Sequence, residues 1–186
     1  MKLFSKIRSS YGEKSLAKKA RALIRHKQVQ NFNTAKTVGI LFDAENIADF
    51  PLVKEFSKYL TGLQIDCFLL GYTNAEEIRS DLLFRDNINI FCARDLDFFF
   101  RPSHPDALKF MSRKFDILIE LSLVDYFPLR YISTLSPALF KVGKFTENDN
   151  NLDLMIDIHS EYKIEFLIQQ IKNYVSILNN PQPATF

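Results

Sequence analysis

The sequence predicts an α/β fold with a single open, mostly parallel sheet of about six strands flanked by helices, Rossmann-like or flavodoxin-like, and an added basic N-terminal helix. Short apolar runs alternate evenly with helical patterns from residue 37 to 178. This alternation is typical of parallel strands joined by right-handed crossovers. The 186 residues, 47% of them apolar, are enough for one domain with a sizeable core.

The first predicted element is a helix over residues 14–31. Its sequence, KSLAKKARALIRHKQVQN, contains no Gly or Pro and is rich in strong helix formers. A helical projection gives this segment a narrow apolar arc opposite a basic arc. The apolar arc holds Leu16, Ala20, Leu23 and Ile24, and the basic arc holds Lys18, Arg21 and Arg25.

The first strand of the sheet is expected at residues 38–42, VGILF. Its apolarity is continuous rather than alternating, which is typical of a strand covered on both faces. Further strands are expected at residues 65–70, 88–93, 115–121, 139–142 and 152–158.

Helices are expected between and after these strands. Asp49 is the predicted cap of a helix with Pro51 in its first turn and Gly62 just past its end. Ser103 and Asp106 resemble a capping box for another helix. The remaining helical patterns cover residues 74–84, 103–113, 128–135 and 161–178.

The predicted organisation is a basic N-terminal helical extension at residues 1–36, an α/β sandwich domain at 37–179 and a frayed tail at 180–186. Residues 1–37 contain ten Lys or Arg and one acid, Glu13, so their formal charge is +9, whereas the rest of the chain carries −7. Such asymmetry is typical of a basic arm that meets an anionic surface. The alternative is a solvated helix whose basic face rests on the acidic body of its own domain.

We expect a cytoplasmic protein without membrane contact. No apolar run approaches the length that spans a bilayer, and the first residues lack the apolar stretch of a secretory signal. The two cysteines, Cys67 and Cys92, lie inside apolar strand-like runs and do not form a disulfide framework.

Polar residues follow the predicted strands, and ligands of open parallel sheets bind at these carboxyl ends. Convergent carboxylates there would suit general acid and base chemistry or a hard cation. The alternative prediction is therefore a small enzyme acting on a sugar, nucleotide or phosphoester. Its candidate residues are Asp43, Glu45, Asn46, Glu120 and Asp157.

Common cofactor and nucleophile motifs are absent. The sequence contains no GxGxxG, no GxxxxGK[ST] and no GxSxG, which argues against dinucleotide, P-loop and nucleophile-elbow chemistry. His26, His104 and His159 are too far apart to suggest a zinc motif. We therefore predict no cofactor and no metal.

The segment LDFFFRP, residues 96–102, has two interpretations. It presents aromatic rings to bases or a partner protein, or it folds them over the sheet edge. Phenylalanine is abundant, with 18 residues in the chain, which favours the second interpretation.

Several segments carry resemblances to known families. AKTVGILFDA, GYTN, FDILIELS and LSPALFKVG, together with the pair His26–Lys27, resemble a family of short uncharacterised α/β proteins from Bacteroidetes over residues 14–178. This resemblance implies the fold and a cytoplasmic setting but no reaction. FDILIELS and SPALFKVG also resemble the amino-terminal half of heptosyltransferase-type sugar transferases over residues 115–143, which implies architecture and no catalytic residue.

The leading functional prediction is a non-enzymatic binding or adaptor protein that docks on an anionic partner, RNA or a ribonucleoprotein particle such as the ribosome. Mobile cationic side chains would contact phosphates with little sequence preference. A third hypothesis is that the apolar arc of the N-terminal helix pairs with a second copy or another protein. The predicted nucleic-acid contacts are Lys14, Lys18, Lys19, Arg21, Arg25 and Lys27.

Overall fold

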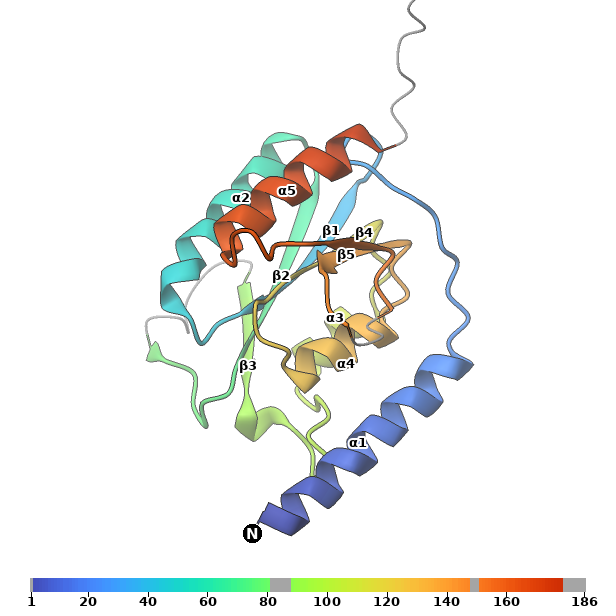
Figure 1. Ribbon diagram of the computed structural model, residues 1–186, viewed down its shortest axis with the longest axis vertical. Coiled ribbons are helices and arrows are strands. Elements are labelled where there is room, and N and C mark those ends of the chain that lie inside the picture. The colour runs from blue at the N-terminus through green and yellow to red at the C-terminus, as the bar shows by residue number, and fades with distance from the viewer. Residues whose placement is uncertain (1, 81–87, 148–150, 179–186) are drawn as a thin grey trace, which may run out of the picture.

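The computed structural model describes residues 2–80, 88–147 and 151–178. Six parallel strands form one sheet in the order β3-β2-β1-β4-β5-β6, which confirms the predicted Rossmann-like α/β fold (Figure 1). All six predicted strands are present, with their ends shifted by a few residues. The strands are β1 Thr37–Asp43, β2 Asp66–Thr73, β3 Ile88–Cys92, β4 Ile117–Leu121, β5 Phe140–Lys144 and β6 Leu154–Ile156.

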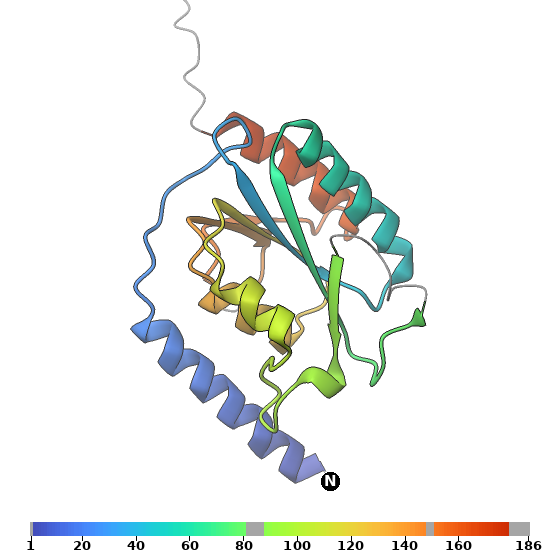
Figure 2. The same ribbon diagram turned by 180° about the vertical axis from the view of Figure 1, so that it is seen from behind.

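Helices cover both faces of the sheet, as the continuous apolarity of the strands requires. Along β1, Ile40 and Phe42 belong to the core under α2 and α5, whereas Leu41 belongs to the core under α3 and α4. Figures 1 and 2 show these two layers from opposite sides. The helices are α2 Phe50–Gly62, α3 Pro105–Ser112, α4 Phe127–Leu135 and α5 Ile164–Ile177, and short 3-10 helices occur at Ile47–Asp49 and Ala93–Asp95.

The N-terminal helix, α1, covers Lys2–Ala22 and lies outside α4 as a further layer (Figures 1 and 2). The prediction of a helix over 14–31 is therefore wrong at both ends. Residues 23–36 run along the molecule as an irregular segment before β1. In this segment Gln28 N donates to Leu139 O at 3.0 Å and Asn31 Nδ2 donates to Leu178 O at 2.6 Å. These contacts with the domain replace the helical hydrogen bonds that the residue types favour.

Two smaller expectations differ from the structure. The cap of α3 is His104, whose Nδ1 accepts from Asp106 N at 3.3 Å, and not Ser103. The helix expected at residues 74–84 is absent from its described part, where 74–77 form bends. Residues 81–84 and the expected tail at 180–186 lie outside the described residues.

Candidate functional site

Helix α1 is held closely against the domain. Gly12 lies where the helix meets the loop after β3, and a Cβ there would be 2.5 Å from Phe99 O. Leu16, one turn further along, is 5% exposed. Because Leu16 is buried against its own domain, it is not available for the hypothesised pairing with a second protein. Ile24 from the same predicted arc is 98% exposed, since the helix ends before it.

The inward charged residues of α1 anchor it to the domain. Arg8 Nε donates to Phe98 O at 2.6 Å, and its guanidinium lies 4.5 Å and 4.3 Å from the ring centroids of Phe98 and Phe100. Glu13, the acid of the basic segment, receives two hydrogen bonds from Arg130 of α4, at 2.6 Å and 3.0 Å. Such a bidentate pair fixes both distance and orientation.

The opposite side of α1 faces solvent. Lys14, Lys18 and Arg21 recur at four- and three-residue steps, so they share one side of the helix. All three side chains are exposed, and no ion pair is recorded for them within the described part of the chain. Tyr11, 58% exposed, continues the same side. We call Tyr11, Lys14, Lys18 and Arg21 the outward face of α1. Lys19 is also exposed, but its Nζ donates to Tyr131 Oη at 2.9 Å.

Arg25 does not have the mobile side chain that we expected of a phosphate contact. It lies in the irregular segment after α1, its side chain is 6% exposed, and it forms an ion pair with Asp153. Lys27 Nζ lies 3.3 Å from the same carboxylate, although the lysine side chain is 67% exposed. Burial alone would raise the pKa of Asp153, but hydrogen bonds from Arg25 and from the backbone of Lys141 hold this pKa below its ordinary value. The Arg25 charge is thus neutralised within the domain.

The acidic residues proposed for an enzyme are dispersed along the carboxyl edge of the sheet. Asp43 accepts from Glu45 N at 2.8 Å, and Glu45 accepts from Asn74 N at 2.9 Å. Asn46 caps the short helix after β1 by accepting from Ala48 N at 3.2 Å. Asp43 and Asn46 therefore order the loop after β1, and Glu45 ties that loop to the end of β2. Asp157, beyond β6 at the other end of the carboxyl edge, accepts from His159 N at 2.8 Å and is exposed.

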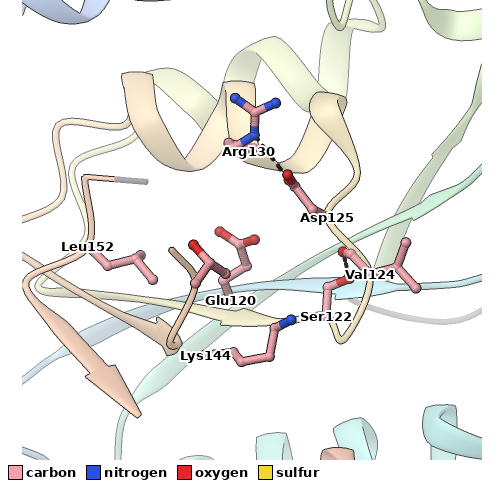
Figure 3. Close-up of a pocket in the computed structure, with 8 residues that line it drawn as sticks. Glu120, Ser122, Val124, Asp125, Arg130, Lys144 and Leu152 are labelled. Carbon is pink, nitrogen blue, oxygen red and sulfur yellow. Dashed lines mark hydrogen bonds and ion pairs between the residues drawn. The ribbon is translucent and has the colours of Figure 1, made fainter. Parts of the chain in front are cut away.

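Glu120 of β4 lies at a small cavity between β4, β5 and α4 (Figure 3). Burial raises the pKa of its carboxyl group. The neighbouring charges already have partners, because Arg130 binds Glu13 and Asp125, while Lys144 Nζ donates to Leu123 O at 3.0 Å. The cavity volume of about 20 Å³ is enough for one water molecule. The enzyme alternative thus stays a prediction without a substrate-sized space at Glu120.

Two further absences concern only the residues that the structure describes. Among them, no group of three or more His, Cys, Asp and Glu side chains has the arrangement of a metal site. Within the same ranges, none of the helices combines the length and apolarity needed to cross a membrane.

Sequence reasoning missed a buried cation next to the basic segment. Lys141 of β5 is 1% exposed, and its Nζ donates to Ser133 O at 2.6 Å and Thr134 O at 3.0 Å. Burial, with a smaller contribution from nearby Arg25, lowers its pKa to about 7. The one sequence signal is its position inside the apolar strand LFKV, where a lysine must be buried. Arg8 and Arg130 were missed because their partners are distant in sequence.

Comparison with known proteins identifies a family but no activity. No curated protein matches the chain. A crystal structure of a D-isomer specific 2-hydroxyacid dehydrogenase family protein from Aeromonas salmonicida subsp. salmonicida A449 aligns with 93% of this chain and 61% of that chain, at 13% identity and a TM-score of 0.29. The chain thus spans less than two thirds of that protein, and so distant a likeness says nothing about function. The expected source in Bacteroidetes and the likeness to heptosyltransferases stay predictions. The model of a family of unknown function (DUF6913) matches residues 8–178, and the chain belongs to this family.

Proposed function

We propose that this protein is a non-enzymatic binding protein that docks on RNA, free or within a ribonucleoprotein particle, through the outward face of α1. The observation that carries the proposal is the direction of the ion pair that holds α1: the helix supplies the acid and the domain supplies the base. The acid of the segment, Glu13, forms an ion pair with Arg130 of the domain, so Lys14, Lys18 and Arg21 stay exposed when α1 packs on the domain. If the basic face instead packed on an acidic surface of the domain, these three cations would be paired with its carboxylates.

RNA fits this face better than a featureless polyanion. Cations spaced along one side of a helix attract phosphates, with a strong dependence on salt. Tyr11 beside them is 58% exposed, although its ring also contacts that of Phe99 with centroids 5.7 Å apart, and stacking of a base on an aromatic side chain contributes about 1–3 kcal/mol. The acidic remainder of the chain, with a formal charge of −7, repels RNA and so orients the molecule toward it through α1.

The free cysteines, Cys67 and Cys92, accord with a cytoplasmic location, which we also propose.

The test is anisotropy of a labelled single-stranded oligouridine titrated with the full chain at several salt concentrations. The variant Lys14→Gln/Lys18→Gln/Arg21→Gln should bind more weakly, and the slope of log K against log salt should fall by about 2, since each lost phosphate contact removes about 0.7. A matched control, Lys36→Gln/Lys58→Gln/Lys114→Gln, loses the same charge from exposed positions outside α1. It should retain the wild-type slope.

Equal loss of affinity in the two triple variants would show a nonspecific effect of net charge and would refute the proposal. Wild-type affinity in the α1 variant would refute it as well. A further variant, Tyr11→Leu, should weaken binding without changing the salt slope, because stacking releases no counterions.

A further inference from the structure

A second feature at the carboxyl edge of the sheet has the size of a ligand site. A cavity of about 580 Å³ lies between the N-terminal half of α1, the loop after β3 and the start of α4, and this loop and α1 lie side by side in Figures 1 and 2. Cavities of this size are typical of small-molecule sites. The residues that matter to the argument are Arg8, Tyr72, Asn74, Glu76, Phe100 and Tyr126.

The cavity lies where the strand order reverses. Tyr72 belongs to the end of β2 and Tyr126 follows β4, and these two strands flank β1 in the sheet. From β1 the chain builds the sheet first in one direction and then, from β4, in the other. Open parallel sheets bind ligands at this switch point, outside the carboxyl ends of the strands.

Aromatic rings form much of the lining. Tyr126 is partly exposed at the cavity, and the buried ring of Tyr72 supports it edge to face, with centroids 5.3 Å apart. Phe100 has a φ of 62°, a left-handed conformation that costs a phenylalanine roughly 1–3 kcal/mol and that recurs at ligand sites. Arg8 closes the α1 side, and its charge is covered by the rings of Phe98 and Phe100.

The electrostatics of the cavity oppose phosphate. Glu76 is an exposed carboxylate at the lining, and no side-chain partner is recorded for it within the described residues. Burial, together with nearby acidic groups including Glu45 and Glu76, raises the pKa of Tyr72 to about 12. The Tyr72 hydroxyl therefore stays protonated and donates to Asn74 Oδ1 at 3.1 Å, which orients the side-chain amide of Asn74.

We propose that this cavity binds an unphosphorylated nitrogen heterocycle of the nucleobase type, presented as a nucleoside. The half-buried rings of Tyr126 and Phe100 offer the surface against which the flat base packs, while Glu76 and the Asn74 amide bond its N–H and ring-nitrogen groups. Among the described residues, three carboxylates and one cation line the cavity: Glu76, Asp97, Asp125 and Arg8. This excess of negative charge, with the absence of a glycine-rich loop, disfavours a phosphate on the same ligand. The site does not depend on the outward face of α1, none of whose residues lines the cavity.

The experiment is isothermal titration calorimetry of the full chain with the four ribonucleosides and with their 5′-monophosphates. We expect saturable binding of at least one nucleoside and binding of its monophosphate about tenfold weaker, a difference of about 1.4 kcal/mol. Glu76→Gln should weaken nucleoside binding and reduce the discrimination against the monophosphate. Glu77→Gln, the adjacent carboxylate whose partner is Arg94 and which does not line the cavity, should change neither.

A cavity-filling variant separates this proposal from the RNA proposal. Ser9→Trp places a large ring at an exposed α1 position that lines the cavity, and it should abolish nucleoside binding while retaining oligouridine binding and thermal stability. The proposal is overturned if no nucleoside binds at millimolar concentration, if the monophosphate binds as well as the nucleoside, or if Ser9→Trp leaves binding intact.

Discussion

The buried lysine of β5 should make the stability of this protein depend on pH. Lys141 Nζ donates to two carbonyl groups in the last turn of α4, which lack helical partners of their own. In the unfolded chain the lysine has its ordinary pKa of 10.5, whereas in the folded chain burial lowers the pKa to about 7. Between these values, unfolding takes up a proton. The free energy of unfolding should therefore rise as the pH increases from about 7 to 10.5.

The size of this effect follows from the interval between the two pKa values. Each pH unit within it contributes about 1.4 kcal/mol to the free energy of unfolding. The whole interval corresponds to about 5 kcal/mol, fully present above pH 10.5 and lost as the pH falls to about 7. This is a large fraction of the stability of an ordinary domain, about 5–15 kcal/mol.

Urea denaturation of the wild type and of Lys141→Met at several pH values between 7 and 10.5 measures the effect. Methionine does not titrate, so the stability difference between wild type and variant should shift by several kcal/mol in favour of the wild type as the pH rises. Lys58→Met, at an exposed position of α2, serves as the control for removal of one lysine. Parallel pH profiles for the wild type and Lys141→Met would refute the reasoning.

Two further substitutions test how the basic segment is attached. Gly12→Ala should loosen the packing of α1 on the domain, because the new Cβ would lie 2.5 Å from the backbone carbonyl oxygen of Phe99. Faster amide hydrogen exchange in α1 would reveal this loosening. Gly62→Ala is the control, since a Cβ there meets nothing within 4 Å. Arg25→Met should lower the free energy of unfolding by about 3–5 kcal/mol, because it leaves Asp153 half-buried without its main partner. Lys27→Met, at a mostly exposed side chain, should cost less than about 1 kcal/mol, and equal losses would contradict this assignment.

The strands of the sheet were predictable because each is marked by a short apolar run within its own sequence. The run at residues 38–42 has apolar side chains on both faces, and β1 Thr37–Asp43 is buried on both faces for that reason. The three-residue strand β6 is shorter than the predicted 152–158 because apolar residues continue past its last ladder position. Strand order was not predictable, since it depends on pairing between distant segments.

The bounds of α1 were not predictable from helix propensity. Gly12 lowers the propensity of the first residues, so the sequence favours a helix that starts after it. In the structure this glycine lies within the helix, where its lack of a side chain lets α1 approach the loop at Phe99. At the other end, residues with high propensity leave the helix because Gln28 and Asn31 bond to the domain. In both places tertiary contact outweighs a preference of about 1 kcal/mol or less per residue.

The functional prediction depends on whether each cation faces solvent or the domain, and the net charge of the segment does not reveal this. The formal charge of +9 fits an RNA-binding face and a self-docked helix equally well. In the structure the cations of the segment fall into two groups, one paired with the domain and one facing solvent. Arg25 and Lys27 share Asp153, a residue more than a hundred positions away, whereas α1 is docked through Glu13 and Arg130 and leaves Lys14, Lys18 and Arg21 outward. Docking and positive surface thus depend on different residues, so the α1 triple variant should affect RNA binding and the Arg25→Met variant should affect stability, each without the other effect.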